Sequence, residues 1–432
     1  MEGTKNKKFI EWIKTTLIVL LTASALLLGW QTKVFNDFFS VIPLFGNVAE
    51  LVRGAAGAGS SEPGGVSFME ATRPLVIVIT DEHGERYGAK YDTDERNSVY
   101  YRTSSILGDA LGSASSPLEI SENEWRIALS GLGVYFEYLL PVRLSILDGW
   151  LGASLPDAMG DASVRRVFVA FDEEMSRVYY QDFDSGLFFV AETASSAGKA
   201  QELEIYSTNG ALFAFETGVN AAENAPYVLI MPGSDYSDVL VFSAGSADVL
   251  LDLVLDAMGH SNDIYSSYYP NNGMLGRVGT QFNIRVDTFE RVFYRQTDNS
   301  PSDSEEQLSG DNEMIERARA IVADTIGKID SDAEIFYESM VYGENGSRSL
   351  FFGYYIAGGR IYLYEDGYAA RITFTDGIVT EVELNFRCFS QNGEYTSLLP
   401  ERLALASAGG EFILCYYDTG AELLQQMWVH HN

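Results

Sequence analysis

The stretch SLFFGYYIAGGRIYLYEDGYAARITFTDGIVTEVELNF, residues 349–386, alternates apolar and polar side chains over short runs. This period of two is typical of strands that bury one face. Two Asp-Gly pairs, Asp366-Gly367 and Asp376-Gly377, interrupt the runs, and Asp-Gly favours tight hairpin turns. The sequence therefore predicts a series of antiparallel strands in this part of the chain.

Amphipathic helices are predicted before two sets of strands. In EMIERARAIVADTIGK, residues 313–328, one face of the helix is apolar. Its apolar residues are Met314, Ile315, Ala318, Ile321, Val322 and Ile326. A similar helix is predicted in SADVLLDLVLDAMG, residues 246–259, with Ser246 as its N-cap and Gly259 as its stop. The predicted fold class is α+β, with antiparallel sheets packed against helices.

The outer part of the chain is predicted to contain several α+β domains. The acidic, Ser-rich segment 298–312 is a linker by composition, between a central domain, residues 226–297, and a C-terminal domain, residues 313–432. An N-terminal domain is predicted over residues 66–225. It opens with the buried strand RPLVIVIT and contains a capping box in Ser121–Glu124.

An apolar run near the amino end predicts a single transmembrane helix, residues 15–32. Between Lys14 and Lys33 lie eighteen uncharged residues, which span roughly 27 Å as a helix, close to a hydrocarbon core of about 30 Å. A cleaved signal peptide is the alternative, but its apolar region is usually about 7–15 residues long and ends at a small-residue cleavage site. Trp12 and Trp30 bracket the run, as interfacial aromatic residues do. The pattern favours an anchor that is not cleaved.

The tail before this helix predicts its orientation. Residues 1–14 contain four Lys and two Glu, and an excess of Lys keeps such a tail in the cytoplasm. Residues 33–65, a juxtamembrane segment and a Gly-rich linker, then lead to the domains outside the cell. The whole chain has a net charge of −32, and the first 33 residues carry +3. The rest of the chain therefore carries a net charge of −35. This acidity argues against nucleic acid and anionic headgroups as partners.

One face of the predicted transmembrane helix is a candidate contact surface. This face consists of four residues separated by four, three and four positions along the chain, a spacing that places them on one side of a helix. They are Ile18, Thr22, Ala25 and Gly29. The small pair Ala25 and Gly29 allows a second helix backbone to approach closely. A helix that faces only lipid is the alternative. The spacing predicts packing against the transmembrane helix of a partner.

The residues that carry catalysis or bind metals are sparse. The four histidines, whose spacing matches no zinc motif, are His83, His260, His430 and His431. The SSAGK stretch, residues 195–199, is interpreted as a loop and not as the site of a Ser nucleophile. No catalytic residue, cofactor site or metal site is therefore predicted. A pair of carboxylates for glycoside hydrolysis is set by spatial distance, which the sequence leaves open.

Two further features leave alternatives open. The acidic turn YDTDERN, with Asp92, Asp94 and Glu95, is either a solvated turn or a Ca²⁺ site, and it lacks the Gly and the distal Glu of an EF-hand loop. Cys388 and Cys415 either pair or remain buried thiols, because two cysteines do not define a disulfide framework.

The order of these elements resembles a known family. In DVLLDLVLDAMGHSNDIYSSYYPNNG, residues 248–273, a helix is followed by a Ser-Asn-Asp turn and by strands that display a polar NNG. Together with the anchor, this segment resembles the YycH regulators of Gram-positive bacteria, which accompany the cell-wall-sensing histidine kinase WalK (YycG). Residues 354–386 look like the C-terminal domain that YycH shares with its partner YycI.

The resemblance implies a non-enzymatic protein of the cell membrane. Such a protein forms a complex with a YycI-like protein and the kinase through transmembrane and extracytoplasmic contacts, and so adjusts kinase activity. One alternative is an extracytoplasmic protein that binds cell-wall glycan, peptide or another ligand, with Tyr265, Tyr268 and Tyr269 available to stack on sugar rings. An anchored hydrolase is a further alternative.

Overall fold

The computed structural model describes residues 73–430 except 158, 161, 173–174, 195–196, 218–224, 232–237, 247–248, 262, 270–274, 298–306, 344, 365–366 and 409–410. The predicted tail 1–14, transmembrane helix 15–32 and juxtamembrane segment 33–65 lie outside the described residues and stay predictions. Within the described residues, no helix has both the length and the apolar character needed to span a bilayer. These residues belong to one compact unit, Gly64–Asn432.

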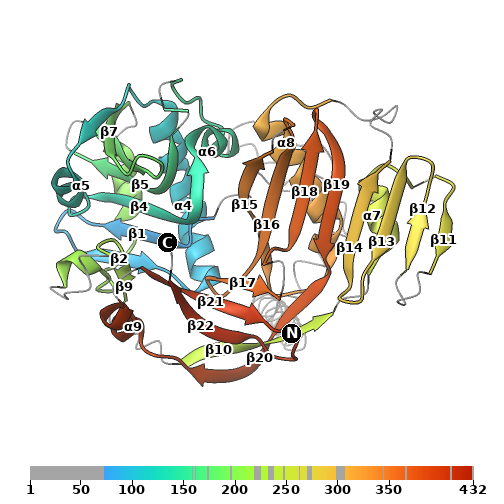
Figure 1. The fold of residues 1–432 in the computed structure, drawn as a ribbon. Helices are drawn as coiled ribbons and strands as arrows, with labels where there is room; N and C mark the ends of the chain where they lie inside the picture. Colours follow the sequence, from blue (N-terminus) through green and yellow to red (C-terminus); the bar gives the residue numbers. More distant parts are fainter. Residues whose placement is uncertain are drawn as a thin grey trace, which may run out of the picture. The chain divides into compact units, whose positions relative to one another are not determined.

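A seven-stranded sheet is built by the first half of this unit (Figure 1). Its strands are β1 (Val76–Thr80), β2 (Arg86–Ala89), β3 (Leu118–Ile120), β4 (Gly133–Arg143), β5 (Ser163–Phe171), β6 (Ser176–Asp182) and β7 (Phe188–Thr193). They lie in the order β2-β1-β4-β5-β6-β7-β3, and every pair is antiparallel. The strand predicted in RPLVIVIT is confirmed, because all five residues of β1 are buried.

Both faces of this first sheet are covered, which explains the continuous apolar run of β1. Ile77 and Ile79 point into the core that contains α4 (Thr93–Gly112), whereas Val76 and Val78 point into a second core around Trp125. Trp125 belongs to α5 (Glu122–Ala128), where the predicted capping box of Ser121 and Glu124 is present. The remaining elements here are α6 (Leu144–Leu151), η2 (Ala197–Leu203), η3 (Ala214–Glu216) and the antiparallel pair β8 (Leu212–Phe213) and β9 (Leu229–Ile230).

An eleven-stranded sheet is built by the second half of the unit. Its strands are β11 (Ser266–Tyr268), β12 (Gly276–Val278), β13 (Phe282–Val286), β14 (Arg291–Gln296), β15 (Glu334–Tyr342), β16 (Arg348–Ile356), β17 (Gly359–Leu363), β18 (Ala370–Thr375), β19 (Ile378–Asn385), β21 (Phe412–Asp418) and β22 (Gln425–His430). The order is β11-β12-β13-β14-β19-β18-β16-β17-β21-β22, with β15 also paired to β16. All its pairs are antiparallel except β17–β21, so the α+β class with antiparallel sheets is confirmed for the described residues.

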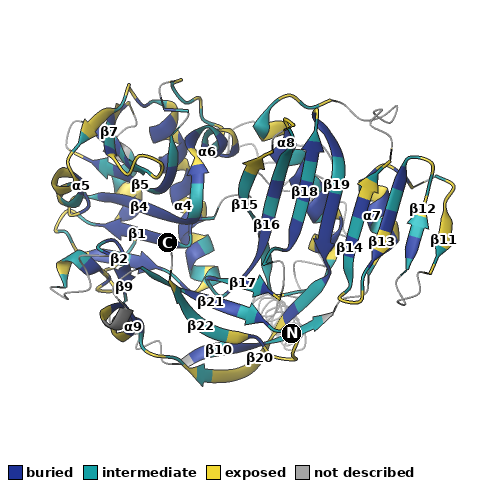
Figure 2. Ribbon diagram, in the orientation of Figure 1, coloured by how far each residue is buried: buried dark blue, intermediate teal, exposed yellow. Residues whose placement is uncertain are grey.

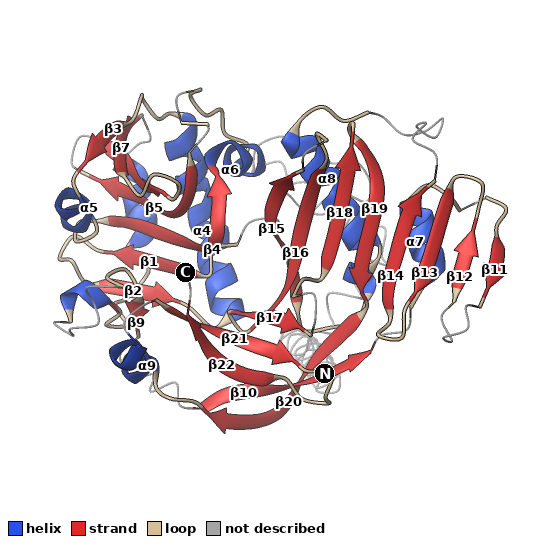
Figure 3. Cartoon of the chain, viewed as in Figure 1, coloured by secondary structure: helices blue, strands red, loops and turns tan. Residues whose placement is uncertain are grey.

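Two helices pack on one face of this second sheet, α7 (Leu251–Ala257) and α8 (Asp311–Asp324), the latter continued by η5 (Ile326–Lys328). In Figure 3 both are seen behind the strands. The apolar face predicted for residues 313–328 is confirmed, because all six of its residues are buried. A separate antiparallel pair, β10 (Asp238–Ser246) and β20 (Arg387–Ser397), and the helix α9 (Glu401–Ala408) complete the fold.

The predicted start of the helix in residues 246–259 is wrong. Ser246 is the last residue of β10 and pairs with Arg387 of β20, so it cannot cap a helix. The helix instead begins at Leu251 without a side-chain cap. Its buried residues include Leu251 and Leu255, while Leu250 is exposed. Pairing with a distant strand has overridden the local capping signal.

The two Asp-Gly pairs have different outcomes. Asp376 and Gly377 have φ values of 51° and 80° and join β18 to β19, which confirms the predicted tight hairpin. The hairpin predicted at Asp366-Gly367 is wrong, because β17 and β18 pair with β16 and not with each other. The turn between β16 and β17 lies at Ala357-Gly358 instead.

The predicted central and C-terminal segments contribute to the same sheet. β14, from residues 226–297, pairs with β19, from residues 313–432, along Arg291–Arg295. The two segments therefore share one hydrophobic core in the described chain. Whether 66–225, 226–297 and 313–432 fold as independent domains stays a prediction.

Candidate functional site

The predicted transmembrane contact residues Ile18, Thr22, Ala25 and Gly29 lie outside the described residues. The structure therefore does not place them, and the helix–helix contact stays a prediction. Ser195 and His431 also lie outside the described residues. The described part of the chain places the remaining sequence candidates, together with a buried ion cluster and an open sheet face that the sequence did not single out.

The positions of His83, His260 and the acidic turn are explained by their places in the fold. His83 lies exposed in the turn between β1 and β2. His260 is buried, with its Nδ1 2.8 Å from Asp263 Oδ2 and its Nε2 2.9 Å from the Tyr294 hydroxyl. In the acidic turn, Asp92 accepts a hydrogen bond from the Glu95 backbone amide and caps α4. No group of His, Cys, Asp and Glu side chains suited to a metal ion occurs among the described residues.

The two cysteines are separate thiols in the structure. Cys415 is buried in β21, and desolvation raises the pKa of its thiol to about 12. Cys388 is half-buried in β20, close to Gly245. Of the two alternatives that the sequence left open, the structure has no disulfide between Cys388 and Cys415.

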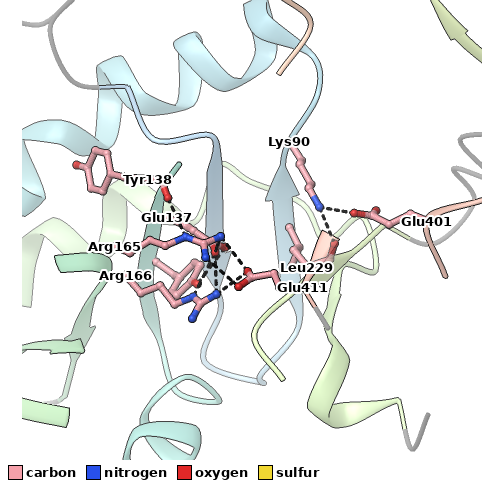
Figure 4. A network of polar contacts seen from close by, with 9 residues as sticks. Lys90, Glu137, Tyr138, Arg165, Arg166, Leu229, Glu401 and Glu411 are labelled. Atoms are coloured by element: carbon pink, nitrogen blue, oxygen red, sulfur yellow. Dashed lines mark hydrogen bonds and ion pairs between the residues drawn. The ribbon is translucent and has the colours of Figure 1, made fainter. Parts of the chain in front are cut away.

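A buried cluster of two arginines and two glutamates joins the first sheet to the C-terminal segment (Figure 4). Arg165 Nη1 and Nη2 lie 2.8 and 2.9 Å from the two carboxylate oxygens of Glu411, just before β21. Arg166 Nη2 donates to Glu411 Oε1 at 2.6 Å and to Glu137 Oε1 at 3.1 Å. Arg165 also lies 2.9 Å from Glu137 of β4. Two positive charges therefore balance two negative charges in a site whose four side chains are at most 15% exposed.

A bulge in β5 allows two consecutive arginines to reach one cluster. In a regular strand, neighbouring side chains point to opposite faces. The register of β5 shifts between Val164 and Val167 against β6, and the partner strand β4 shifts after Glu137. A bulge re-aims a side chain in this way. Arg165 and Arg166 can therefore both form ion pairs with Glu137 and Glu411.

A second contact fastens the same C-terminal segment. Lys90, just after β2, donates to the carboxylate of Glu401, the first residue of α9. The hydroxyl of Tyr91 donates to the same oxygen at 2.7 Å. On α9, Leu405 is buried against Val228 and Ile230. The ion cluster and α9 together hold the end of the chain on the first sheet.

The cluster predicts how stability depends on pH. Burial alone would raise the pKa of Glu411, but Arg166 and Arg165 outweigh it and hold the pKa of this carboxyl well below its usual range. A lowered folded-state pKa stabilises the protein fully above the unfolded-state pKa of about 4.3, and this stabilisation is lost as the pH falls toward the folded-state pKa. We expect the stability difference between wild type and Glu411→Gln to be constant from pH 7 to about pH 5 and to shrink below about pH 4.3. Urea midpoints measured across this range test it, and a difference that stays constant down to pH 3 would contradict it.

The face of the second sheet opposite α7 and α8 carries a row of aromatic and charged residues. Strand register places Tyr268, Gly276, Arg285, Phe293, Glu383, Arg371 and Phe351 directly opposite one another on successive strands. On β13, Ile284 points into the core, so Arg285 points to the other face. We call these seven residues the open-face row. It crosses seven strands, roughly 29 Å at about 4.8 Å per step.

Contacts along the open-face row order its side chains. The Tyr268 ring lies across Gly276, where a Cβ atom would be 2.2 Å from the ring. The guanidinium of Arg285 lies 4.6 Å from the centroid of the Phe293 ring. Arg371 pairs with Glu383 at 2.7 Å. Stacking and pairing of this kind hold long side chains in place, which lowers the entropy lost when a partner binds.

Five of the seven residues of the open-face row are exposed or half-buried, whereas Gly276 and Glu383 are buried. Arg285 is exposed, and Phe293 and Phe351 are half-buried. In the adjacent cross-strand row, the side chains of Arg295 and Glu381 are 72% and 40% exposed. Figure 2 shows intermediate and exposed residues along β11, β12 and neighbouring strands. No salt bridge to Arg285 is formed by the described residues.

Two of the three predicted sugar-stacking tyrosines lie outside this row. Tyr268 belongs to it, and its hydroxyl donates to Asn283 Oδ1 at 3.2 Å. Tyr265 is covered on one side by the guanidinium of Arg277, 4.7 Å from its ring centroid. Tyr269, next to the edge strand β11, is 74% exposed. The structure therefore does not gather the three rings into one stacking platform.

A pocket of about 360 Å³ adjoins the open-face row. The β13–β14 turn and the residues after β21 form its walls, with Phe289 and Tyr364 more than half exposed. Arg291 lines it and pairs with Asp287 at 2.6 Å, and its guanidinium also lies 5.6 Å from the Phe293 ring centroid. Exposed rings beside guanidinium groups suit a polar ligand with flat faces.

Sequence reasoning missed the open-face row. The alternation in FNIRV, RVFYRQ and ARITFT already places Arg285, Phe293 and Arg371 off the core face. The order β13-β14-β19-β18-β16, however, brings together strands from distant parts of the chain. The sequence signal was therefore present within each strand, while the row itself depends on strand order.

Comparison with known proteins assigns neither a family nor a function. No family model and no curated protein matches the chain. Among solved structures, the chain is similar to the crystal structure of YycH from Bacillus subtilis, with a TM-score of 0.48 and 11% sequence identity. The alignment covers 86% of this chain and 96% of YycH.

Proposed function

We propose that this chain is a non-enzymatic, membrane-anchored regulator of a cell-wall-sensing histidine kinase of the WalK type. In this proposal the predicted helix 15–32 spans the membrane, the N-terminus is cytoplasmic and the bulk of the chain lies outside. Its partners are the kinase and a YycI-like membrane protein. The proposal rests on the predicted anchor and on the resemblance carried by residues 248–273 and 354–386.

The observation that supports a contact function is the open-face row. Aromatic residues and Arg are enriched where protein interfaces gain most of their affinity. Arg285 is exposed and lacks a salt bridge among the described residues, in a chain whose part beyond residue 33 carries a net charge of −35. A partner surface with carboxylates complements this local positive charge.

Contacts alone suffice to regulate a kinase. A regulator shifts the balance between two kinase states only if it binds one state more tightly than the other. A difference of about 1.4 kcal/mol changes that balance tenfold. An extended, preordered row of side chains and a transmembrane helix face can each supply part of this difference.

Two substitutions test the proposal on the two contact surfaces. We expect Arg285→Glu to weaken co-purification of the full-length chain with the full-length kinase at least tenfold, because it replaces the unpaired cation by an anion. Gly29→Leu should weaken it independently, because a larger side chain keeps the helix backbones apart. Lys328→Glu, an exposed charge reversal beside α8, is the matched control and should leave association unchanged. Unchanged association in both test variants would refute the proposal.

A second candidate function is the binding of cell-wall glycan or another extracytoplasmic ligand. The pocket beside Phe289 and Tyr364 favours it, because exposed rings next to polar groups are the common way to bind sugars. Pull-down with purified peptidoglycan separates the two functions. A protein that only contacts a kinase stays in the supernatant, whereas a glycan-binding protein sediments and loses this property on Phe289→Ala.

A further inference from the structure

The pocket of about 360 Å³ beside the open-face row contains polar groups that are held in place by the protein. Its volume is within the range of about 300–1,000 Å³ that is usual for small-molecule sites. Arg387 Nε and Nη2 donate to the two carboxylate oxygens of Asp418 at 2.8 and 3.0 Å. The buried amide of Asn385 donates to the Tyr368 carbonyl at 2.9 Å, which orients this side chain. Polar groups fixed in this way can recognise the hydroxyl and amide groups of a ligand.

Aromatic rings and hydroxyl groups complete the lining of the pocket. Phe289 and Tyr364 present rings that are more than half exposed, and the side chains of Thr288 and Thr419 also line the space. A sugar ring has apolar faces that stack on aromatic side chains and hydroxyl groups at its rim that form hydrogen bonds. The mixture of rings and fixed polar groups therefore suits a sugar ring better than an aliphatic chain.

A single carboxylate organises the β13–β14 turn, which carries Phe289. Asp287 accepts hydrogen bonds from the backbone amides of Phe289 and Arg291 at 2.9 and 3.0 Å. It also accepts one from Arg291 Nε at 2.6 Å. Glu290 has a φ of 62°, a left-handed conformation that is uncommon for a residue other than glycine and that recurs at ligand sites. The backbone of Phe289 and the guanidinium group of Arg291 are therefore held by the same residue.

Arg291 connects this pocket to the open-face row. Its guanidinium lies 5.5 Å from the ring centroid of Phe289 and 5.6 Å from that of Phe293. Phe293 belongs to the row, and the guanidinium of Arg285 lies 4.6 Å from its ring centroid. Contacts of this kind between rings and guanidinium groups are attractive. We call Phe289, Arg291, Phe293 and Arg285 the ring–guanidinium series, which runs from the pocket to the row without a gap.

We propose that the pocket binds a sugar ring and that the bound sugar strengthens the kinase contact of the open-face row. A sugar that stacks on Phe289 restricts the motion of this exposed ring. The ring–guanidinium series passes the restriction on to Phe293 and Arg285. A partner that binds side chains already ordered loses less conformational entropy, so its affinity rises without a change of shape. Binding changes no covalent bond. This inference rests on the proposed function and adds the class of ligand that regulates it.

The first measurement concerns the sugar alone and uses the full-length chain in phosphatidylcholine nanodiscs. N-acetylglucosamine is titrated by isothermal calorimetry. The matched control is N-cyclohexylacetamide, which keeps a six-membered ring and the amide but lacks the hydroxyl groups. We expect the sugar to bind and the control to bind at least tenfold more weakly. Absence of sugar binding, or equal binding of the two compounds, would overturn the proposal.

Two variants locate the sugar in this pocket. Thr419→Trp fills the space from the segment after β21, and Thr288→Trp fills it from the exposed β13–β14 turn. We expect each to weaken sugar binding at least tenfold by steric exclusion. Either variant suffices if the other fails to fold. Wild-type affinity for the sugar in a folded variant of this pair would overturn the location of the site.

The second measurement is the affinity of the full-length kinase with and without saturating N-acetylglucosamine. We expect the sugar to raise this affinity at least threefold in wild type. Phe293→Leu interrupts the ring–guanidinium series, so the factor should fall to about one while the sugar still binds. Tyr268→Leu removes a ring of the same row outside the series and should keep the factor. An unchanged or lowered kinase affinity in wild type, or an undiminished factor in Phe293→Leu, would overturn the proposal.

A third measurement needs no kinase and separates failure of this inference from failure of the proposed function. The Nε–H signal of Arg285 in the NMR spectrum is identified by its loss in Arg285→Lys. We expect this signal to shift when the sugar is added to wild type and to stay in place in Phe293→Leu. A shift without any kinase association would refute the proposed function and leave the link between pocket and row standing. Kinase association without a shift would overturn the link and leave the proposed function standing.

Discussion

Glu411→Gln should lower the free energy of unfolding by about 3–5 kcal/mol at neutral pH. The substitution removes one of two buried carboxylates and leaves Arg165 and Arg166 to share Glu137. Both guanidinium groups are at most 11% exposed, so water does not replace the lost partner. Because the cluster joins β5 to the segment before β21, the loss also loosens the end of the chain. Urea unfolding of the full-length chain in nanodiscs, followed by far-ultraviolet circular dichroism, measures the effect.

The control for this substitution is chemically matched. Glu422→Gln removes an exposed carboxylate near β22 and should change stability by no more than about 0.5 kcal/mol. Adding Arg165→Met to Glu411→Gln restores a one-to-one charge balance and should recover part of the loss. A loss below about 1 kcal/mol for Glu411→Gln would mean that water enters the cluster, against the burial described above.

Trp125→Ala should destabilise the first sheet by about 3–5 kcal/mol. Trp125 is fully buried, and its ring centroid lies 5.6 Å from that of Phe188 and 6.1 Å from that of Tyr227. Its removal leaves a cavity in the second core, which also contains Val76 and Val78 of β1. Since the surrounding strands are held by pairing on both sides, they cannot collapse into the space. Circular dichroism during urea unfolding reports this loss independently of tryptophan fluorescence.

Two further variants, one at Trp125 and one elsewhere on α5, test whether the loss of stability comes from the cavity. The Trp125 indole N–H has no hydrogen-bond partner among the described residues, which costs about 1–3 kcal/mol in the native protein. Trp125→Phe removes this unpaired group and keeps a ring, so it should cost much less than Trp125→Ala. Ile127→Ala, on the same helix but 64% exposed, should change stability by no more than about 0.5 kcal/mol. Equal losses in Trp125→Phe and Trp125→Ala would contradict the cavity explanation.

Features that depend on neighbours in the sequence could be predicted. Three such features are the apolar face of α8, the capping box of Ser121 and Glu124, and the turn at Asp376-Gly377. In each of them, successive residues are no more than four positions apart. In such features the side chain and the backbone group that it satisfies are held close by the chain itself. The apolar run that predicted β1 and the alternation that predicted the strands of residues 349–386 are likewise local.

Features that depend on distant partners could not be predicted. The start of α7 was misplaced because Ser246 pairs with Arg387, 141 residues further along. The buried cluster joins Arg165 to Glu411 across 246 residues, and another ion pair joins Arg96 to Glu334 across 238. Neither pair carries any sequence signal, because Arg and Glu are common surface residues.

The sequence by itself determined the α+β class, the apolar face of α8, the strand β1, strands within residues 349–386, and the apolar run whose role as an anchor stays a prediction. Only the tertiary structure decided that strands on both sides of the predicted linker form one sheet, and which side chains meet on its open face. The physical reason is register. A slip of one residue in any strand would turn every side chain to the other face, and register is selected by the packing of the whole core.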